Sequence, residues 1–184
     1  MCGTNATWVL HKNGQLVISG TGVLWAKSQI TWDNTKVVDV IVNEGITRLS
    51  PVYTSELFKN CTNIRNVYLP STLTRLDNSC FEGSSIENVY IPTGMKQIGA
   101  YVFRYCSNLT TLTLPNTVNY INNFAFSRCT SLTSLTVLAT TPPSFNTYGP
   151  GIPAGTTIYV PAASVDTYKT KWSQYANQIQ AINE

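Results

Sequence analysis

The sequence contains few charged residues. Asp, Glu, Lys and Arg make up 11% of its 184 residues, less than half of the roughly 25% that is usual for globular domains. The 12 basic residues are scattered and form no run that would neutralise a row of nucleic-acid phosphates. Thr, Asn, Ser and Tyr are abundant instead. This composition indicates a polar but largely uncharged surface, which favours an extracellular protein and argues against nucleic acid as a partner.

Long apolar runs are absent as well. No stretch of about 18 apolar residues would cross a bilayer, and the N-terminus lacks the charged, apolar and small-residue regions of a secretory signal. We therefore expect the chain as given to be soluble, with no transmembrane segment and with any export signal already absent. Its length and its 43% hydrophobic content are sufficient for one domain with a sizeable core.

Groups suited to catalysis or metal binding are scarce. His11 is the only histidine, so any catalytic triad would need it. The nine carboxylates are spread along the chain, with no close pair on one strand that would suit glycoside hydrolysis. Neither clustered metal ligands nor a glycine-rich phosphate loop occurs. The sequence therefore predicts no catalytic residue, no metal and no cofactor, although acids paired only by folding remain an alternative.

Three consecutive segments superpose position by position. They read IRNVYLPSTLTRLDNSCFEGSSI from Ile64, IENVYIPTGMKQIGAYVFRYCSNL from Ile86 and LTTLTLPNTVNYINNFAFSRCTSL from Leu109. One proline and one phenylalanine in each segment keep the same spacings of 22 and 23 residues. The residues at these two landmarks are Pro70, Pro92 and Pro115, and Phe81, Phe103 and Phe126. Two landmarks that keep one period indicate a repeat protein.

Each unit predicts a short strand followed by a return limb. Apolar residues alternate with period two, as at Val67 and Leu69, before a proline that cannot donate the next ladder hydrogen bond. A unit of this length cannot bury its own apolar edge, so neighbouring units must share a core. The strands are therefore expected to lie parallel, about 4.8 Å apart.

The repeat pattern extends in both directions. Upstream, residues from Val38 to Cys61 fit the same columns, with four extra residues between Leu49 and Phe58. Downstream, a further unit begins at Leu132 and breaks off at Pro142-Pro143, since two prolines disfavour another regular strand. We assign about five units of 22 or 23 residues to residues 35–145.

The repeat resembles a known family. The run Phe103-Arg104-Tyr105-Cys106-Ser107-Asn108-Leu109, followed by Leu112-Thr113-Leu114-Pro115, is similar to the BspA-type leucine-rich repeat of bacterial surface proteins. The opening Cys2 to Trp8 with Gly14 to Gly22, and the close at Ile158-Tyr159-Val160-Pro161 with Tyr168 and Trp172, resemble the caps of that family. The resemblance implies an α/β repeat fold, a short right-handed solenoid with a parallel strand face, on a bacterial cell surface or outside the cell.

Caps are expected at both ends of the solenoid. Residues 7–19 read as a hairpin around the turn signal Asn13-Gly14, and this hairpin should cover the first repeat together with Trp25, Ile30 and Trp32. Residues 1–34 are assigned to this cap. Residues 146–184 form the other cap, with a loop at 146–155, a last strand at 157–160 and a helix from Ser164, as its N-cap, to about Ala176.

Five cysteines occur, without closely spaced pairs. Cys61, Cys106 and Cys129 share one column of the repeat, in which Ser84 is the remaining member, so they are interpreted as small buried residues. A disulfide between Cys106 and Cys129 is the alternative. The family resemblance makes Cys2 part of the cap, and a lipidated first residue of a mature lipoprotein is the alternative.

The outward positions of the strands are the candidate binding site. If Val67 and Leu69 point inward, alternate residues point outward and form two ladders along the sheet. The ladders are Asp39, Asn66, Asn88, Thr111 and Ser134, and beside it Ile41, Tyr68, Tyr90, Thr113 and Thr136. Such a face is an extended binding surface, and tyrosine supplies a large contact area at low entropic cost.

The functional hypothesis is a non-enzymatic adhesion or protein-binding module. Its expected partner is a macromolecule, a host or neighbouring-cell surface protein. Three alternatives stay open at this point. In the first, the ladders only stabilise adjacent strands; in the second, the protein is a structural, self-associating surface element; in the third, the tyrosines stack on sugars in a carbohydrate-binding module. The oligomeric state stays open too.

Overall fold

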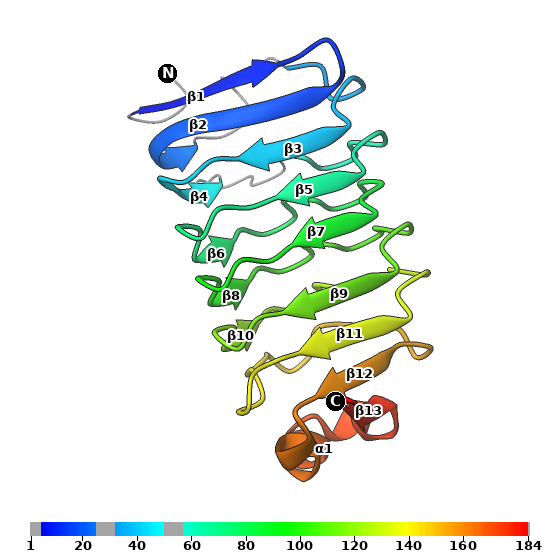
Figure 1. Cartoon of the computed structure of the whole chain (residues 1–184). Helices are drawn as coiled ribbons and strands as arrows, with labels where there is room; N and C mark the ends of the chain where they lie inside the picture. Colours follow the sequence, from blue (N-terminus) through cyan, green and yellow to red (C-terminus); the bar gives the residue numbers. More distant parts are fainter. Residues whose placement is uncertain (1–4, 25–31, 50–56, 184) are drawn as a thin grey trace.

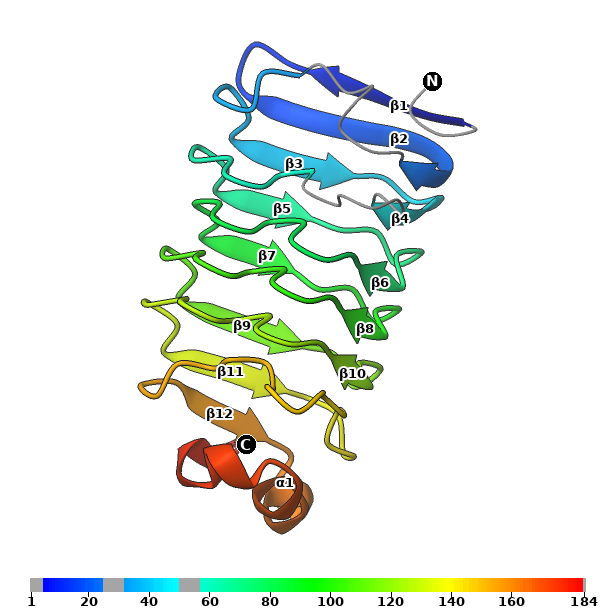
Figure 2. The same cartoon turned by 180° about the vertical axis from the view of Figure 1, so that it is seen from behind.

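The chain winds into an elongated solenoid of short, mostly parallel strands (Figures 1 and 2). The structure is a computed structural model that describes residues 5–24, 32–49 and 57–183. The predictions for Cys2, Trp25, Ile30 and most of the insertion between Leu49 and Phe58 lie outside these residues. The predicted repeat solenoid with a parallel strand face is confirmed.

Two rows of strands run along the solenoid, and we call the outer surface of the first row the strand face. The strands behind this face are β2 (Gln15–Leu24), β3 (Asp39–Val42), β5 (Asn66–Tyr68), β7 (Asn88–Tyr90), β9 (Thr111–Leu114), β11 (Ser134–Val137), β12 (Thr157–Val160) and β13 (Ile179–Ala181). The second row, at the left in Figure 1 and called the second sheet below, contains β4 (Ile46–Leu49), β6 (Arg75–Leu76), β8 (Gln97–Ile98) and β10 (Tyr120–Ile121), and it is joined to the first row through β2.

Stacked aromatic rings form the core between the sheets and the corners that connect the turns. Trp32, Phe58, Phe81, Phe103 and Phe126 stack in succession, with neighbouring ring centroids 5.2–6.1 Å apart and ring planes within 12° of parallel. All four phenylalanines are fully buried. The repeated phenylalanine in the sequence therefore marks a continuous spine that no single unit could bury alone.

The return segment of each turn, which carries the spine phenylalanine and forms the third side of the coil, contains a residue in the left-handed backbone conformation. The second residue after each spine phenylalanine has a positive φ, at Asn60 (58°), Gly83 (68°), Tyr105 (61°) and Arg128 (64°). Glycine and asparagine adopt this conformation readily, whereas tyrosine and arginine do so with strain. Backbone hydrogen bonds between adjacent corners, such as Phe103 N–H to the Ala125 carbonyl at 2.9 Å, offset that strain.

The N-terminal hairpin is integrated into the first turn of the coil. β1 (Asn5–Leu10) pairs antiparallel with β2, as the Asn13-Gly14 turn predicted. β2 then pairs in parallel with β3 through Gln15–Ile18 and with β4 through Gly22–Leu24, with an irregular register at Gly22/Val23. One long strand therefore contributes to both sheets.

The C-terminal end differs from the expected single helix. A 3-10 turn (Ala162–Ser164) leads into α1 (Val165–Lys171), and a second 3-10 segment follows at Ser173–Gln178. The predicted N-cap position at Ser164 is confirmed, although its side chain makes no cap hydrogen bond, whereas the predicted extent to about Ala176 is wrong because the helix ends at Trp172.

Tertiary contacts explain the break at Trp172. Its indole N–H donates to the Pro143 carbonyl at 2.9 Å, and the Tyr168 hydroxyl donates to the Ala139 carbonyl at 2.7 Å. Both rings are buried against the last repeat, so the cap follows these contacts and not the helical repeat. The strand predicted at 157–160 is present as β12, but β13 pairs with it and is a further strand.

Candidate functional site

The structure places all ten predicted binding residues on the strand face, each half-buried or exposed. Pairing aligns Asp39 with Asn66 and Asn66 with Asn88, while Ile41, Tyr68 and Tyr90 align beside them. In the C-terminal half of the same face, Thr111 aligns with Ser134 and Thr113 with Thr136. The expected alternation of inward and outward residues is therefore present along the strands.

The first ladder is joined by side-chain hydrogen bonds. The Asn66 amide donates to the Asp39 carboxylate at 2.7 Å, and the Asn88 amide donates to the Asn66 side-chain oxygen at 3.0 Å. Arg65 and Glu87 form an ion pair next to this ladder. These groups already have partners, so the alternative of strand stabilisation describes the Asp39–Asn66–Asn88 part of the face well.

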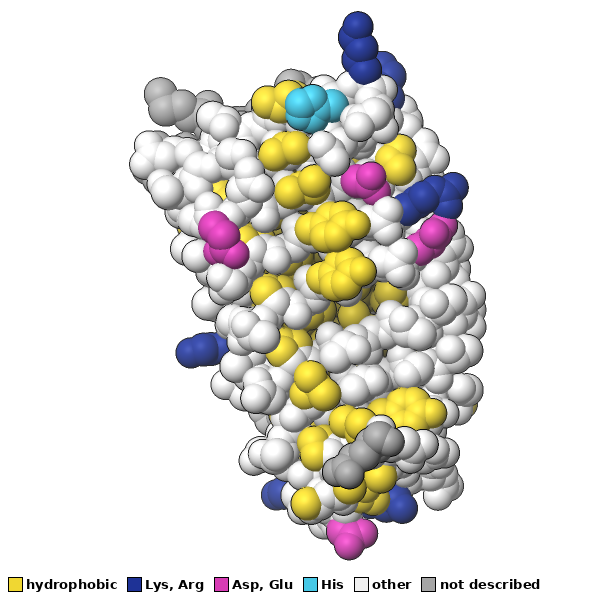
Figure 3. Space-filling view, in the orientation of Figure 1, with side chains coloured by type: hydrophobic (Ala, Val, Ile, Leu, Met, Phe, Trp, Pro, Cys, Tyr) yellow, Lys and Arg dark blue, Asp and Glu magenta, His cyan; other side chains and the backbone are white. Residues whose placement is uncertain are grey.

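The second ladder is apolar and open to solvent over its N-terminal half. The rings of Tyr68 and Tyr90 are 5.4 Å apart with planes 12° from parallel, and the two residues are 44% and 63% exposed. The ladder continues upward through Ile41 and Val17 to Val9, which is 55% exposed. Figure 3 shows this apolar column on the face.

Sequence reasoning missed the two valines of this column. Val9 and Val17 face each other across the hairpin, and the alternation of apolar and polar residues in residues 7–19 was the signal that could have found them. They were assigned only to a cap. Because β2 is itself a strand of the solenoid, the candidate surface extends onto the hairpin.

A break in the sheet lies in the middle of the strand face. β7 is hydrogen-bonded to β5 and β9 to β11, but β7 and β9 are not paired, so the face is divided between two sheets. The other sides of the same two turns remain joined, because β8 pairs with β10 and the Tyr105 N–H donates to the Ser127 carbonyl at 3.0 Å. The two turns therefore separate on the strand face, while they stay hydrogen-bonded to each other on the other sides of the coil.

A groove of about 400 Å³ occupies this break. The strand residues on either side, and the residues that follow each strand, line it. They are Asn88, Val89, Tyr90, Ile91, Thr93, Thr111, Leu112, Thr113, Pro115 and Leu138. None of these side chains carries a charge, and recessed apolar side chains are visible beneath the column in Figure 3. The repeat spacing gives no sign of the groove, because Asn88 on β7 and Thr111 on β9 are 23 residues apart, as are Thr111 and Ser134 on the paired strands β9 and β11.

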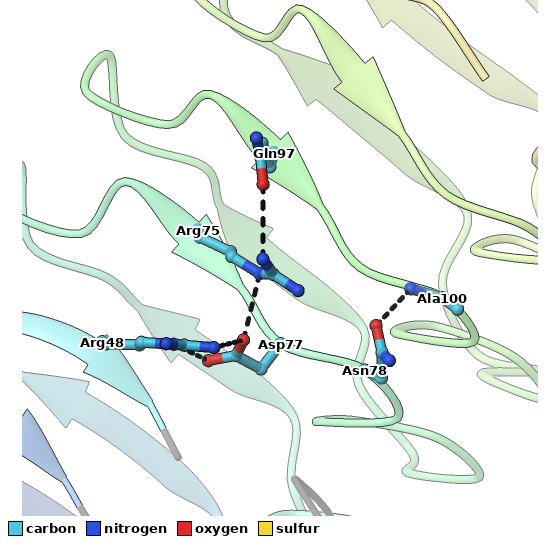
Figure 4. Close-up of polar contacts among 6 residues, drawn as sticks. All are labelled: Arg48, Arg75, Asp77, Asn78, Gln97 and Ala100. Carbon is cyan, nitrogen blue, oxygen red and sulfur yellow. Dashed lines mark hydrogen bonds and ion pairs between the residues drawn. The ribbon is translucent and has the colours of Figure 1, made fainter. Parts of the chain in front are cut away.

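A charged cluster lies on the second sheet, away from the strand face (Figure 4). Arg48 donates two hydrogen bonds to the Asp77 carboxylate, at 2.9 and 2.8 Å, and Arg75 Nε lies 3.0 Å from the same carboxylate. Asp77 is only 5% exposed, and its hydrogen bonds raise the pKa of Arg48 above the ordinary value. The carboxylate bridges two neighbouring guanidinium groups and offsets part of their charge, which is a structural role.

The thiols of the four described cysteines are buried, and those of Cys80, Cys106 and Cys129 form no disulfide. Cys106 donates to the Phe81 carbonyl at 3.1 Å and Cys129 to the Phe103 carbonyl at 2.9 Å, so each thiol bonds to the previous turn. The predicted column of small buried residues is therefore present, and the alternative of a Cys106–Cys129 disulfide is wrong. Burial raises the pKa of Cys106 to about 11 and raises that of Cys129 as well, which leaves both thiols protonated and poor nucleophiles.

The one histidine and most of the possible metal ligands lie in the described part of the chain. His11 is exposed next to the hairpin turn. Within residues 5–24, 32–49 and 57–183, no three His, Cys, Asp or Glu side chains are grouped to hold a metal ion. In the same residues, no helix is long and apolar enough to span a membrane.

Comparison with known proteins identifies the family. The family described as "BspA type Leucine rich repeat region" matches residues 30–147 in six copies, which is well over half of the chain. The protein therefore belongs to the BspA-type leucine-rich-repeat family, as its repeat resemblance indicated. No curated protein sequence matches the chain.

Solved structures of bacterial leucine-rich-repeat proteins share the fold. A leucine-rich repeat protein from Eubacterium ventriosum is 19% identical with a TM-score of 0.59, over 88% of this chain and 65% of its own. The T. pallidum protein TpLRR is 17% identical with a TM-score of 0.54, over 86% of this chain and 79% of its own. The pneumococcal vaccine antigen PcpA is 14% identical with a TM-score of 0.50, over 94% of this chain and 44% of its own. The chain thus spans less than two thirds of the Eubacterium protein and under half of PcpA.

Proposed function

We propose that the protein is a non-enzymatic module of a bacterial cell surface that binds another protein through its strand face, in adhesion to a host or to a neighbouring cell. Membership of the BspA-type family and the likeness to a pneumococcal vaccine antigen support the surface location. The partner is proposed to be a surface or matrix protein.

The exposed pair Tyr68 and Tyr90 is the observation that carries this proposal. Aromatic residues are enriched where interfaces gain most of their binding energy, and these two rings lie next to each other on the solvent side of the sheet. Ile41, Val17 and Val9 extend the same apolar column. Aromatic rings on the solvent side contribute little to the buried core, so binding of a partner explains them better than core packing does.

The polar ladder beside the tyrosines has a different role in this proposal. Asp39, Asn66 and Asn88 satisfy one another's hydrogen bonds and stiffen the strands that carry the rings. A rigid surface loses little conformational entropy when a partner binds. The aromatic column is therefore expected to supply the affinity, and the polar ladder its rigidity.

Binding to immobilised extracellular-matrix proteins tests the proposal. The intact chain is compared with the double variant Tyr68→Ala/Tyr90→Ala and with Tyr148→Ala as a matched control. Tyr148 is 70% exposed but stacks on Phe124 in a corner of the coil. Since truncation of a central interface residue costs about 2 kcal/mol or more, the double variant should bind at least about 30-fold more weakly, and the control should bind as the intact chain does.

The remaining outcomes favour another binding site or another function. Equal binding by the double variant, with its fold verified by circular dichroism, would move the binding site off the tyrosines. Binding to a glycan array but to no protein would favour the carbohydrate-binding module. Concentration-dependent light scattering without any binding would favour the self-associating structural element.

A further inference from the structure

The break between β7 and β9 leaves main-chain groups without partners in the sheet. Alternate residues of a strand direct their N–H and C=O groups to opposite neighbours. The Asn88 N–H donates toward β5, to the Arg65 carbonyl at 2.9 Å, so the N–H and C=O of Val89 face β9. Similarly, the Thr110 carbonyl accepts from β11, so the groups of Thr111 face β7.

These facing groups are not hydrogen-bonded to each other. In the described residues no backbone hydrogen bond joins Val89 to Thr111, whereas the neighbouring strand pairs on either side form regular ladders. Val89 is consequently partly exposed, although its counterparts Val67, Leu112 and Leu135 are buried. An opened strand pair of this kind presents donors and acceptors to an incoming chain, as the edge of a sheet does.

The lining of the groove restricts what enters it. Its floor and far end are apolar, formed by Val89, Ile91, Leu112, Pro115 and Leu138. Its rim is polar and uncharged, from Asn88, Thr111 and Thr113. An occupant with a charge would lose hydration without gaining an ion pair, so the matching chemistry is an apolar group attached to a neutral hydrogen-bonding frame.

The size of the groove fits part of a chain. Its volume of about 400 Å³ is near the lower end of the roughly 300–1,000 Å³ of small-molecule pockets. The other sides of the two turns stay bonded, which prevents the opening from admitting a whole additional strand. An apolar side chain can enter while the main chain that carries it crosses the mouth of the groove.

We propose that the groove between β7 and β9 binds an apolar side chain, aliphatic or aromatic, of an extended and uncharged peptide segment of the protein partner. The segment's main chain hydrogen-bonds to the free groups of Val89 and Thr111, and Tyr90 packs against the segment at the rim. This inference rests on the proposed function and names the part of the strand face that selects the partner.

Blocked tripeptides test the chemistry of the groove. N-acetyl Ser-X-Ser amides with X as Leu, Phe, Ala or Lys are titrated into the full 15N-labelled chain, and amide shifts are followed by NMR. The Leu and Phe peptides should shift the amides of Val89, Ile91, Thr111 and Thr113 saturably, with dissociation constants of about 1 mM. The Ala and Lys peptides should bind at least about tenfold more weakly.

A variant that fills the groove with a large side chain, compared with a matched control outside it, tests the location of peptide binding. Thr113→Trp places a large ring on the rim, while Thr136→Trp places the same ring one turn further along the same ladder, outside the groove. Peptide shifts should disappear in Thr113→Trp and remain in Thr136→Trp, with both folds checked by circular dichroism. Equal shifts in both variants, equal affinity for the Lys and Leu peptides, or saturable shifts only with an N-acetylglucosamine disaccharide would overturn the inference.

The two proposals fail in different ways. Matrix-protein binding that is lost in Tyr68→Ala/Tyr90→Ala but kept in Thr113→Trp would refute the groove as the selecting site and leave the strand-face function intact. Peptide binding in the groove without binding to any protein would support the groove and refute the adhesive function tested above.

Discussion

Val67 and Val89 occupy equivalent, directly paired positions on β5 and β7, yet Val67 is completely buried whereas Val89 is partly exposed. The difference arises because β5 has a hydrogen-bonded neighbour on each side, β3 and β7, while β7 has one only on the side of β5. One missing strand pairing thus converts a core position into the wall of a groove.

Hydrogen exchange should report this difference directly. The Val67 N–H lies within the β5–β7 ladder, whereas the Val89 N–H faces the gap, so Val89 is expected to exchange at least about 100-fold faster. NMR-detected exchange of the two amides in one sample measures it. Protection of Val89 equal to that of Val67 would show that β7 and β9 are paired in solution and that the groove is closed.

The carboxylate of Asp77 should be important for stability. Asp77→Asn leaves Arg48 and Arg75 next to each other without a negative partner. Hydrogen bonds to charged groups contribute about 1.5–3 kcal/mol each in favourable cases, but both arginines are more than a third exposed. We therefore expect the free energy of unfolding to fall by about 1–2 kcal/mol in urea titrations. Asp33→Asn, which breaks an exposed ion pair with Lys36, is the control and should cause no measurable change.

Close packing between turns should make Gly99 irreplaceable by alanine. A Cβ atom there would lie 2.6 Å from the Leu76 carbonyl oxygen and 2.8 Å from the Asp77 carbonyl carbon, both in the backbone of the preceding turn. Overpacking of this kind costs about 1–3 kcal/mol, so Gly99→Ala should lower the midpoint of thermal unfolding.

Gly155→Ala is the matched control for this substitution. No atom lies within 4 Å of the position that a Cβ at Gly155 would occupy, so this variant should unfold at the same temperature as the intact chain. A Gly99→Ala midpoint equal to that of Gly155→Ala would contradict the close packing between turns.

The buried thiols should make stability depend on alkaline pH. Burial raises the pKa of Cys106 from 9.0 to about 11, so the folded state holds this proton more tightly than the unfolded state does. The resulting stabilisation is complete below pH 9.0 and is lost as the pH rises through about 11. Cys106→Ser introduces the residue that Ser84 already provides in the preceding turn. In this variant, the free energy of unfolding should decline less between about pH 8.5 and about pH 10.5, and urea titrations across this range measure it. An unchanged decline would mean that Cys106 does not cause it.

A reagent test accompanies the pH experiment. In a Cys2→Ser variant at about pH 8, a thiol reagent should label none of the buried cysteines of the folded protein, because burial keeps them protonated and inaccessible. After denaturation all four should react. Rapid labelling of the folded variant would mean that the corners of the coil open readily.

The sequence predicted those features that recur with the repeat. Val67 and Leu69 alternate with Tyr68, and this period of two defined both the inner and the outer side of β5. The phenylalanine column defined the spine for the same reason. A periodic signal works here because every turn repeats the same contacts with the turns before and after it.

Structural features that do not recur in every repeat unit could not be predicted from the repeat pattern. The helical tendency around Tyr168 was recognised, but the hydrogen bond from Trp172 to the Pro143 carbonyl ends the helix through a contact 29 residues away in sequence. β13 is a strand because β12 offers it an edge. The groove depends on how two turns are spaced, which no single column of residues encodes.

The double role of β2 has a mechanical consequence for the proposed adhesive function. β2 pairs with β3 through one half and with β4 through the other, so a pull along the long axis loads two rows of bonds at the hairpin end. At the β7–β9 junction the row on the strand face is absent, although the junctions on either side have it. Tension would therefore stretch the solenoid first at the groove, and the shape of this proposed binding site would change with the load.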